Sequence, residues 1–559
     1  MMMPILTPTV SISTTAALND TSDVSDSPPA NKTGGKDDSS SMPSKHIRQS
    51  YFKSHNIDLY PRYVHPDPSI APLSEIGDLV DTWDTRLQNG EKNDGSATVL
   101  TTIHGRVTHK REASKKLIFY GVTQNGRSIQ VVSSKARYTG PIDEFIVLNK
   151  GIRAGDIISA TGFIGKTNTG ELSVFVSSDL KILSPCYHDI PFKSGLREPE
   201  RRFRHRHLDL IVNKKSVSNI LVRSKVLKGI RQFLDTRGFV EVETPILSTE
   251  VGGANAKPFI TRSNAFGADL DMYLRIAPEL FLKKLVIGGI EKVYEIGKQF
   301  RNEGVDTDHN PEFTTCEFYQ AYTNLDGLIS MTENLLHELT TTIRGTDEVQ
   351  VIQKNGDRVK VSFKPPFNRV YVIPALEEHM GTKLPDLDEP DSVDQLLSLC
   401  RELSIPFPSE PHNIPRIMDH LISTFIEPRC IQPTFILNHP TVMSPLAKAI
   451  NKEKTISGRF ELFVNGKEIV NAYEELNDPD DQRERFQRQN IDRLGGDQEV
   501  PQPDLEFCDA LEYGLPPTSG WGMGIDRVVA LLSEVSHLRE TIAFPVMRPQ
   551  NLKKPQEDS

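Results

Sequence analysis

Residues 300–313 combine side-chain types that can bind a nucleotide. Arg301 and Glu303 are two positions apart in a strand-like segment, so their side chains share one face. An arginine there can hold a phosphate or a carboxylate through two parallel hydrogen bonds. Phe313, beyond the loop GVDTDHNP, could stack on a purine. A surface hairpin closed by a salt bridge would have the same pattern, so these residues alone leave both interpretations open.

Two glutamates flank a predicted tight turn at Asn465–Gly466. Glu461 and Glu468 are seven positions apart, which suits two strand positions facing each other across a hairpin. Adjacent carboxylates repel each other unless a cation lies between them, and Mg²⁺ binds few carboxylates together with phosphate oxygens. The pair therefore predicts a magnesium site, with two solvated hairpin acids as the alternative.

Alternating glycines at 520, 522 and 524 precede Arg527. In a strand they would leave one face bare, so that a flat ligand could lie against the backbone. Arg527 falls at the start of an apolar helical segment, where a phosphate could bind. The spacing is not that of the dinucleotide-binding fingerprint.

Acids and tyrosines recur between these segments, at Glu279, Glu317, Tyr319, Tyr473 and Glu475. If they converge, they form a negative pocket suited to a substrate with two ammonium groups, because a buried ammonium needs carboxylate partners. Taken singly, each is better explained as a surface acid or a core tyrosine.

The elements that must position these residues predict an α+β domain. A helix is expected over 216–239 and a short strand over 240–247, ended by Pro245. Strand-like segments at 291–303, 312–322, 458–476 and 519–524, with helices between them, favour an antiparallel sheet. The apolar residues at helical spacing are Val217, Ile220, Leu221, Leu227, Ile230 and Leu234.

Residues 97–190 have a different pattern, with short β-branched and aromatic runs broken by the turns Gln124–Gly126 and Asn168–Gly170. About five strands in this length fit a small closed barrel such as an OB-fold, which often binds single-stranded nucleic acid. Candidate base and phosphate contacts are Phe119, Arg111 and Gln130. The alternative is that Phe119 is core and Arg111 a solvated surface charge.

The remaining segments are predicted from composition. Residues 1–50, rich in Ser, Thr, Asp and Pro, are expected to be a disordered tail, followed by a helical lead-in over 51–96. Residues 191–207 form a basic hinge too densely charged to be core, whose arginines either contact nucleic-acid phosphates or pair with acids on both neighbours. Residues 551–559 are a C-terminal tail.

Composition narrows the class of protein. The chain has 559 residues, which predicts several domains, and 37% hydrophobic and 25% charged residues allow a sizeable core. No apolar run is long enough to cross a bilayer. The net charge of −10 argues against nucleic-acid binding by bulk positive charge, but allows local basic patches. Five dispersed cysteines without metal-site spacing favour a reducing compartment.

Together these segments resemble the class II aminoacyl-tRNA synthetases, and specifically the lysyl-tRNA synthetase family of eukaryotic cytoplasmic type. Residues 238–247, 300–322 and 520–527 resemble the three class motifs in order. Residues 252–261, 274–280 and 471–479 resemble the lysine-specific versions of the segments between them. The similarity runs from about residue 50 to 550, and the tail lacks the lysine-rich extension of many eukaryotic members.

The resemblance implies an ATP-dependent lysine–tRNA ligase with an OB-fold anticodon-binding domain at 97–190 and a class II catalytic domain at 208–550. L-lysine would attack the α-phosphorus of ATP, and the lysyl group would then pass to the terminal adenosine of tRNA(Lys). The implied cofactor is Mg²⁺ and the implied location cytoplasmic, with no membrane contact. A homodimer would form through the first motif, with room for a multi-synthetase complex.

The resemblance also implies roles for single residues. Arg301 would be catalytic, holding the ATP α-phosphate and the lysine carboxylate, while Arg527, also catalytic, would meet the γ-phosphate. Phe313 would stack on adenine. The implied ATP contacts are Glu303, His309 and Asn310, and the implied Mg²⁺ ligands are Glu461 and Glu468. The α-amino group of lysine would be bound by Gly253 and Glu279, its ε-ammonium by Glu475, Tyr319 and Tyr473, and the rest of the amino acid by Asn471 and Glu317. The anticodon would be contacted by Arg111, Phe119, Gln130 and Glu171.

Three alternatives remain at this point. A synthetase for aspartate or asparagine would share the architecture, but its pocket should offer cations to the substrate. An inactive RNA-binding or signalling relative would be favoured by loss of Arg301 or Arg527, and both are present. A ligase that modifies a protein would be expected to lack the barrel.

Overall fold

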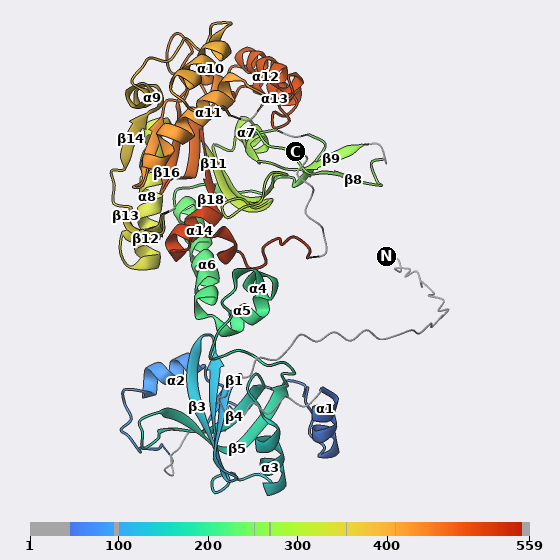
Figure 1. The fold of residues 1–559 in the computed structure, drawn as a ribbon. Coiled ribbons are helices and arrows are strands. Elements are labelled where there is room, and N and C mark those ends of the chain that lie inside the picture. Colours follow the sequence, from blue (N-terminus) through green and yellow to red (C-terminus); the bar gives the residue numbers. More distant parts are fainter. Residues whose placement is uncertain are drawn as a thin grey trace, which may run out of the picture.

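The computed structural model describes residues 45–93, 100–250, 252–267, 270–353, 355–408 and 410–550. A barrel at one end and a larger sheet domain at the other are joined through the short helices α4 (Pro199–Arg204) and α5 (Arg206–Val212) (Figure 1). The predicted tail before residue 45 and the tail at 551–559 lie outside the described residues. In the described part of the chain, no helix is long and apolar enough to cross a membrane.

The N-terminal unit starts earlier than the sequence indicated. Helix α1 (Lys45–Ser54) includes the last residues of the predicted tail, and Arg48 is 3% exposed. Its guanidinium donates to the carbonyl of Gly151 and pairs with the buried Asp156. This contact ties α1 to the barrel, so the boundary at residue 50 was wrong. The predicted helical lead-in contains one further helix, α2 (Ile76–Trp83).

The barrel has the predicted five strands, closed in the order β1-β2-β3-β5-β4. Strands β3 and β5 pair in parallel, and α3 (Ile142–Gly151) lies between β3 and β4 in the chain. The barrel interior is apolar and includes Val107, Tyr120 and Val174, all fully buried. The strands are β1 (Thr101–Ser114), β2 (Leu117–Gln124), β3 (Arg127–Ser134), β4 (Ile157–Lys166) and β5 (Leu172–Ser184).

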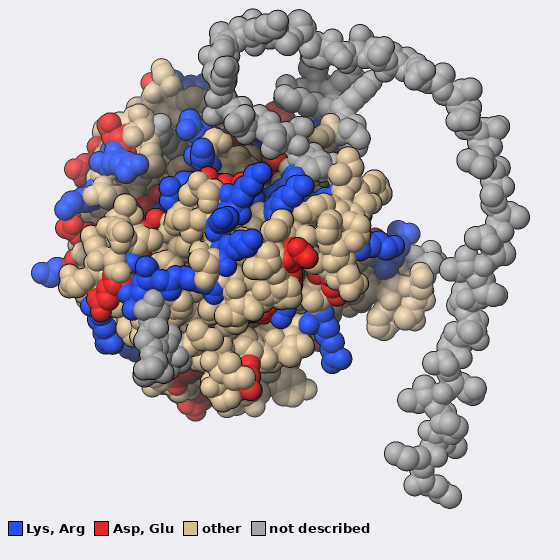
Figure 2. All heavy atoms as spheres, turned by 90° about the horizontal axis from the view of Figure 1, so that it is seen from below, with Lys and Arg blue, Asp and Glu red and all other residues tan. Residues whose placement is uncertain are grey.

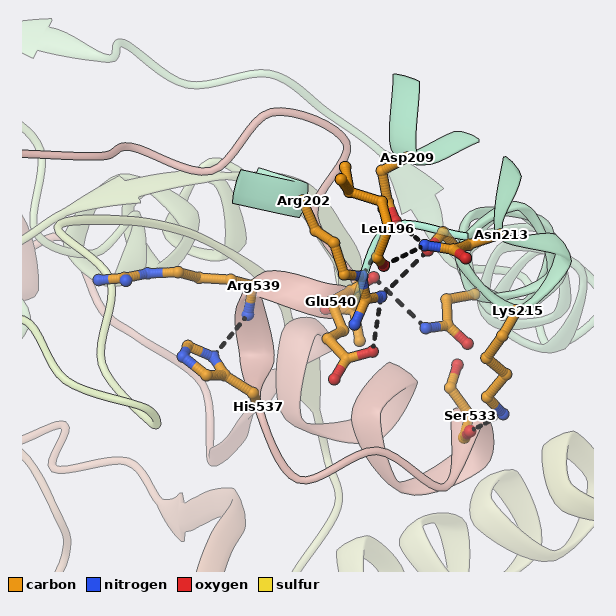
Figure 3. Close-up of polar contacts among 12 residues, drawn as sticks. Leu196, Arg202, Asp209, Asn213, Lys215, Ser533, His537, Arg539 and Glu540 are labelled. Carbon is orange, nitrogen blue, oxygen red and sulfur yellow. Dashed lines mark hydrogen bonds and ion pairs between the residues drawn. The ribbon is translucent and has the colours of Figure 1, made fainter. Parts of the chain in front are cut away.

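The hinge is helical and partly buried, which corrects the prediction that it is too charged to be core. Arg206 is 2% exposed and pairs with Asp209 at 2.6 Å. Its other nitrogens donate to the carbonyls of residues 540, 542 and 543. Arg202 also pairs with Asp209 and reaches Glu540, so the hinge is fastened to the C-terminal segment (Figure 3). For these two arginines, pairing with protein groups is therefore the correct alternative.

The large domain is built on an eight-stranded sheet in the order β14-β15-β16-β17-β18-β11-β10-β6, as the α+β prediction required. Its pairs are antiparallel except β6 with β10 and β14 with β15. Helices α6, α8 and α14 share a hydrophobic core with the sheet, while α7, α12 and α13 share a second core with β10 and β11. The strands are β6 (Val240–Glu241), β10 (Lys292–Phe300), β11 (Glu312–Ala321), β14 (Asn368–Tyr371), β15 (Thr434–Leu437), β16 (Arg459–Val464), β17 (Lys467–Glu474) and β18 (Thr518–Gly524).

Helices surround this sheet, and α9, α10 and α11 form a separate core that includes residues of β15 and β16. Their bounds are α6 (Lys214–Asp235), α7 (Glu279–Ile287), α8 (Leu325–Arg344), α9 (Val372–Met380), α10 (Ser392–Glu402), α11 (Ile414–Phe425), α12 (Pro479–Leu494), α13 (Leu505–Leu511) and α14 (Ile525–Ser533). Small sheets are formed by β7 (Leu247–Ser248), β8 (Ile260–Arg262) and β9 (Asp271–Leu274), and by β12 (Glu348–Ile352) and β13 (Arg358–Ser362).

The first-motif segment differs from its prediction in two respects. Helix α6 is present, but Leu221, assigned to its packing face, is 58% exposed, whereas the polar Asn219 is buried. The following strand is broken into β6 and β7, with Pro245 between them. A proline lacks the N–H that a continuous ladder needs.

Candidate active site

A cavity of about 430 Å³ lies against the face of the sheet formed by β11, β17 and β18. It is as large as typical small-molecule sites. The predicted residues that line it are Gly253, Glu279, Arg301, Glu303, His309, Asn310, Phe313, Glu317, Tyr319, Glu461, Glu468, Asn471, Tyr473 and Arg527. Segments more than 270 residues apart in the chain therefore meet in one place.

The nucleotide side of the cavity contains Arg301 at the end of β10 and Phe313 at the start of β11. The guanidinium of Arg301 lies 5.1 Å from the centroid of the Phe313 ring, which holds it in place. Among the described residues, Nε of Arg301 and Oδ1 of Asn310 are buried without a hydrogen-bond partner. Buried polar atoms are normally paired, so both atoms are free to bind a ligand.

The loop between β10 and β11 is held at both sides. The carbonyl of Thr307 accepts a hydrogen bond from the backbone N–H of Leu538, 3.1 Å away. Asp308 pairs with Lys467 of β17. Within the loop, Nδ1 of His309 lies 3.0 Å from Asp306. His309 is half exposed at the edge of the cavity, where it could contact the outer part of a nucleotide.

Arg527 enters the cavity from the first turn of α14. Its Nη1 donates to the carbonyl of Glu468 at 2.6 Å and lies 3.5 Å from the Glu468 carboxylate. One guanidinium edge is thus fixed by β17, and a nearby phosphate would meet a positioned cation. The predicted strand-to-helix junction after the alternating glycines is confirmed.

Glu461 and Glu468 do not face each other directly, which corrects the expected hairpin register. Glu461 pairs across the strands with Asn471, and Glu468 with Phe463. The register shifts between these pairs, and the extra residue on β17 brings Glu468 and Asn471 to the same cavity.

The neighbours of Glu461 stabilise the ionised form of its carboxyl. Burial alone would raise the pKa of its carboxyl, but the adjacent Arg459 and His439 lower that pKa to about 2. Arg459 lies 2.5 Å from Oε1, and His439 lies 3.3 Å from Oε2. Among the described residues, no three or more His, Cys, Asp or Glu side chains are grouped to hold a metal ion. A cation here would therefore need phosphate oxygens as further ligands.

The opposite side of the cavity is acidic. Glu279, in the first turn of α7, is 5% exposed and accepts a hydrogen bond from the Tyr473 hydroxyl at 2.6 Å. Gly253 has φ +84°, and a Cβ atom there would lie 2.9 Å from Cβ of Glu279. Glycine thus lets the backbone approach this carboxylate closely.

Glu317 and Tyr319 lie on β11 and are 9% and 3% exposed. Burial, reinforced by the charge of Glu279, raises the pKa of Glu317 to about 8. The same causes raise the pKa of Tyr319 well above its usual value, so its hydroxyl stays protonated. An ammonium group placed here would favour the ionised form of Glu317.

Glu475 is the predicted pocket residue that does not line the cavity. It is 1% exposed and lies behind Gly520, where an added Cβ atom would be 2.0 Å from its Oε1. Its other oxygen pairs with Lys283. Gly520 itself lines the cavity, so the Glu475 carboxylate lies directly behind a wall residue that has no side chain.

Three residues that contact carboxylates of the site, two of them cationic, were missed by the sequence argument. Lys283 contacts Glu279 one helical turn earlier, and that spacing of four was a usable signal. Arg459 is two positions before Glu461 on the same strand face, which was also detectable. His439 reaches Glu461 from outside β16, and no local pattern indicated it.

The barrel carries a second set of predicted contacts. Arg111 and Phe119 are cross-strand partners, and the guanidinium lies 4.4 Å from the ring centroid. Phe119 is half buried and packs in a small cluster outside the main barrel core, so it is not an interior residue. Gln130 donates to Glu171 at 2.6 Å.

The charge of the barrel differs from that of the whole chain. Residues 100–190 contain 12 lysines and arginines against 7 aspartates and glutamates, whereas the chain has 65 against 75. Seen from the barrel end, lysines and arginines gather on the surface (Figure 2). This local basic patch can attract nucleic acid despite the negative net charge.

Comparisons with known proteins agree with this geometry. The family of class II tRNA synthetases for D, K and N matches residues 198–548, and the OB-fold nucleic acid binding domain matches residues 101–182. The probable cytoplasmic lysine–tRNA ligase of Encephalitozoon cuniculi is 45% identical over 454 residues, which are 80% of this chain and 87% of that protein.

Two further relatives are similar over most of their length. The mitochondrial lysine–tRNA ligase of Schizosaccharomyces pombe is 41% identical over 88% of this chain and 91% of its own. The lysine–tRNA ligase of Enterococcus faecalis is 41% identical over 80% of this chain and 87% of its own length. Since the class II family matches more than half of the chain and these relatives cover most of it, the chain belongs to the lysine–tRNA ligase family of class II aminoacyl-tRNA synthetases.

Proposed function

We propose that this protein activates L-lysine with ATP and transfers the lysyl group to the 3′-terminal adenosine of tRNA(Lys). The observation that carries the proposal is the division of one cavity into two charged sides. Arg301 and Arg527 lie on one side, and the buried carboxylates of Glu279 and Glu317 lie on the other. A nucleoside triphosphate fits the side with the arginines, and an amino acid with two ammonium groups fits the side with the carboxylates.

The chemistry needs positioning and charge stabilisation, and no protein nucleophile. The lysine carboxylate attacks the α-phosphorus of ATP, a P–O bond forms, and pyrophosphate leaves with the electron pair of the broken bond. Arg301 is close enough to Glu317 of the acidic side to lower the pKa of its carboxyl, so it can neutralise the attacking carboxylate and the α-phosphate together. The 3′-hydroxyl of tRNA then attacks the lysyl carbonyl, and AMP leaves.

Two carboxylates could hold Mg²⁺ against the triphosphate. The carboxyl of Glu461 is ionised at neutral pH and stays ionised as the pH falls well below neutral, and Glu468 lines the same cavity. Mg²⁺ commonly takes one or two carboxylates and completes its coordination with phosphate oxygens and water. When bound, the ion would neutralise phosphate charge, while Arg527 would hold the end of the triphosphate.

The barrel is proposed to bind the anticodon. Phe119 offers a half-buried ring for base stacking, Arg111 a cation beside it, and Gln130 with Glu171 a set of hydrogen-bonding groups. Replacing Phe119 by alanine should weaken tRNA charging while pyrophosphate exchange without tRNA stays unchanged. Loss of both activities would contradict this assignment.

Assembly and location are also proposed. Apolar side chains of the first-motif region are exposed in the single chain, including Leu221 at 58%, Val240 at 50% and Ile246 at 46%. Such a surface suits a homodimer interface, which light scattering would test. We also propose that the protein acts in the cytoplasm.

Pyrophosphate exchange with each amino acid tests the function. Lysine should support exchange far better than aspartate or asparagine, because neither of these provides a cation for the acidic side. Glu475→Gln should raise KM for lysine about ten- to hundredfold with little effect on KM for ATP, since a bond to a charged group contributes about 1.5–3 kcal/mol. The matched control is Glu474→Gln, whose carboxylate accepts from the N–H of Leu325 outside the pocket. Equal losses for lysine and ATP would contradict the pocket assignment.

A further inference from the structure

A lysine of the protein itself lies beside the proposed lysine pocket. The side chain of Lys283 is fully buried, and its ammonium nitrogen lies 2.6 Å from Oε1 of Glu279. It also pairs with Glu475. The rings of Tyr473 and Phe507 have their centroids 5.7 and 5.6 Å from it. One buried cation thus contacts both Glu279, to which the family resemblance gives the α-amino group of lysine, and Glu475, to which it gives the ε-ammonium.

These contacts fix the position of both carboxylates. Oε1 of Glu279 accepts from the Lys283 ammonium and from the Tyr473 hydroxyl, each at 2.6 Å, so this carboxylate is held at the cavity wall. Glu475 comes from the chain just after β17 and has its pairing with Lys283 on the side away from Gly520. Without the ammonium, two buried acids on different elements would have no charged partner in common.

The buried charges around the pocket match those of the substrate only when Lys283 is counted. Three carboxylates, of Glu279, Glu317 and Glu475, accompany two cations, Arg301 and Lys283. With all groups ionised, one negative charge remains, and lysine brings one net positive charge. Without Lys283 two negative charges would remain, and a buried carboxylate in excess takes up a proton.

We propose that Lys283 is a positioning residue for amino-acid selection, which holds the carboxyl groups of Glu279 and Glu475 in place for the incoming lysine. The inference rests on the proposed lysine pocket and deepens it. Burial lowers the pKa of Lys283, but the two carboxylates outweigh this and raise it, so the proton of the group stays on the ammonium. Burial raises the pKa of Glu475 well above its usual value, and the charge of Lys283 offsets only part of that rise.

Replacing Lys283 by methionine tests the inference, because methionine is an unbranched side chain only one atom shorter than lysine and has no charge. The matched control is Lys284→Met, since Lys284 is the next residue of α7 and pairs with the exposed Glu506 at 3.1 Å. KM values for lysine and ATP are measured by pyrophosphate exchange between pH 6.5 and 8.5. Calorimetry in buffers of different ionisation enthalpy counts the protons released when lysine binds.

The expected result separates charge from packing. At pH 7, Lys283→Met should raise KM for lysine about tenfold or more, because Glu279 and Glu475 lose the charged partner that holds both of them. KM for ATP should change less than about threefold, and lysine binding should release more protons than in the unmodified protein, because the pKa of Glu475 loses the cation that opposes its rise. Lys283→Arg keeps the cation and should return proton release to the unmodified number. Lys284→Met should behave like the unmodified protein.

Several outcomes would overturn the inference. If Lys283→Met raises both KM values alike, or releases no additional proton, Lys283 serves helix packing only. If that variant does not fold, Lys283→Gln, which keeps a hydrogen-bond donor without charge, is measured in the same way and must meet the same criteria. A wild-type KM for lysine in Glu475→Gln would instead disprove the pocket assignment itself, whatever Lys283 does.

Discussion

Gly520 leaves the room that two side chains of the proposed lysine pocket occupy. A Cβ atom added at this position would lie 2.0 Å from Oε1 of Glu475 and 2.5 Å from Cε1 of Tyr319. Non-bonded heavy atoms approach favourably only to about 3.5 Å, so both groups would have to move by about 1 Å or more. They are 1% and 3% exposed, and neither can turn into solvent.

Gly520→Ala should therefore damage lysine recognition more than ATP binding. Inserting extra volume into a packed core costs about 1–3 kcal/mol, and a displacement of about 1 Å in an active site can reduce the rate about 10²-fold. We expect kcat/KM for lysine in pyrophosphate exchange to fall about 10²-fold. The KM for ATP should change less than about threefold, because Arg301 and Arg527 do not contact the added methyl group.

Gly522→Ala is the matched control on the same strand. Its added Cβ atom would lie 3.5 Å from Cγ of Glu317, which is an ordinary van der Waals contact. Thermal unfolding of both variants shows how much of any loss comes from stability. If Gly520→Ala retains the wild-type KM for lysine, or if both alanines affect lysine kinetics equally, the packing argument for this pocket is refuted.

Three further predictions follow from the same geometry. Arg301→Ala should lower pyrophosphate exchange about 10²-fold or more, because it removes one preorganised donor from the reacting phosphate, and a near wild-type rate would remove Arg301 from the chemistry. The pKa of Glu317 near 8 means that lysine must displace its proton at lower pH, so KM for lysine should rise as pH falls from 8.5 to 6.5, by up to about tenfold per unit; Glu317→Gln should flatten this profile. Arg206→Met should lower the free energy of unfolding by about 1–3 kcal/mol, since Asp209 keeps its pairing with Arg202 but the carbonyls of residues 540, 542 and 543 lose a buried donor, whereas the exposed Arg201→Met should change it by less than about 0.5 kcal/mol.

Local spacing predicted the elements that carry the site. The strands β10, β11, β16, β17 and β18 fall within the expected segments because their alternating side chains match the period of a pleated strand. The tight turn at Asn465–Gly466 was also predictable, because Asn and Gly both tolerate the positive φ that such a turn requires, and their φ values are 53° and 67°. Residue types then indicated which strand positions carry charge.

Partners that are distant in the chain could not be predicted in this way. Arg206 is buried because it donates to a carbonyl 334 positions later, and a segment dense in arginine has no local sign of that partner. Arg48 likewise pairs with Asp156, 108 positions away. The exposure of Leu221 has a different cause, since a helical pattern marks an apolar face without saying whether the same chain or a second copy covers it.

The register of three neighbouring strands arranges polar side chains in two rows along the floor of the proposed lysine pocket. Tyr319 of β11 and Tyr473 of β17 both pair with Gly520 of β18, and two residues along, Glu317 and Asn471 both pair with Gly522. Each row thus has a glycine between two polar side chains, so the floor is open and the walls are polar.

The separation of these two rows follows from strand geometry. Two residues along a strand span about 6.7 Å, close to the length of an extended lysine side chain. The row of Glu317 and Asn471 lies towards Arg301, where the amino-acid head group must react, and the row of Tyr319 and Tyr473 lies towards Glu475. A shorter cationic amino acid could not reach both rows at once, so the pleat of the sheet itself contributes to selection by length.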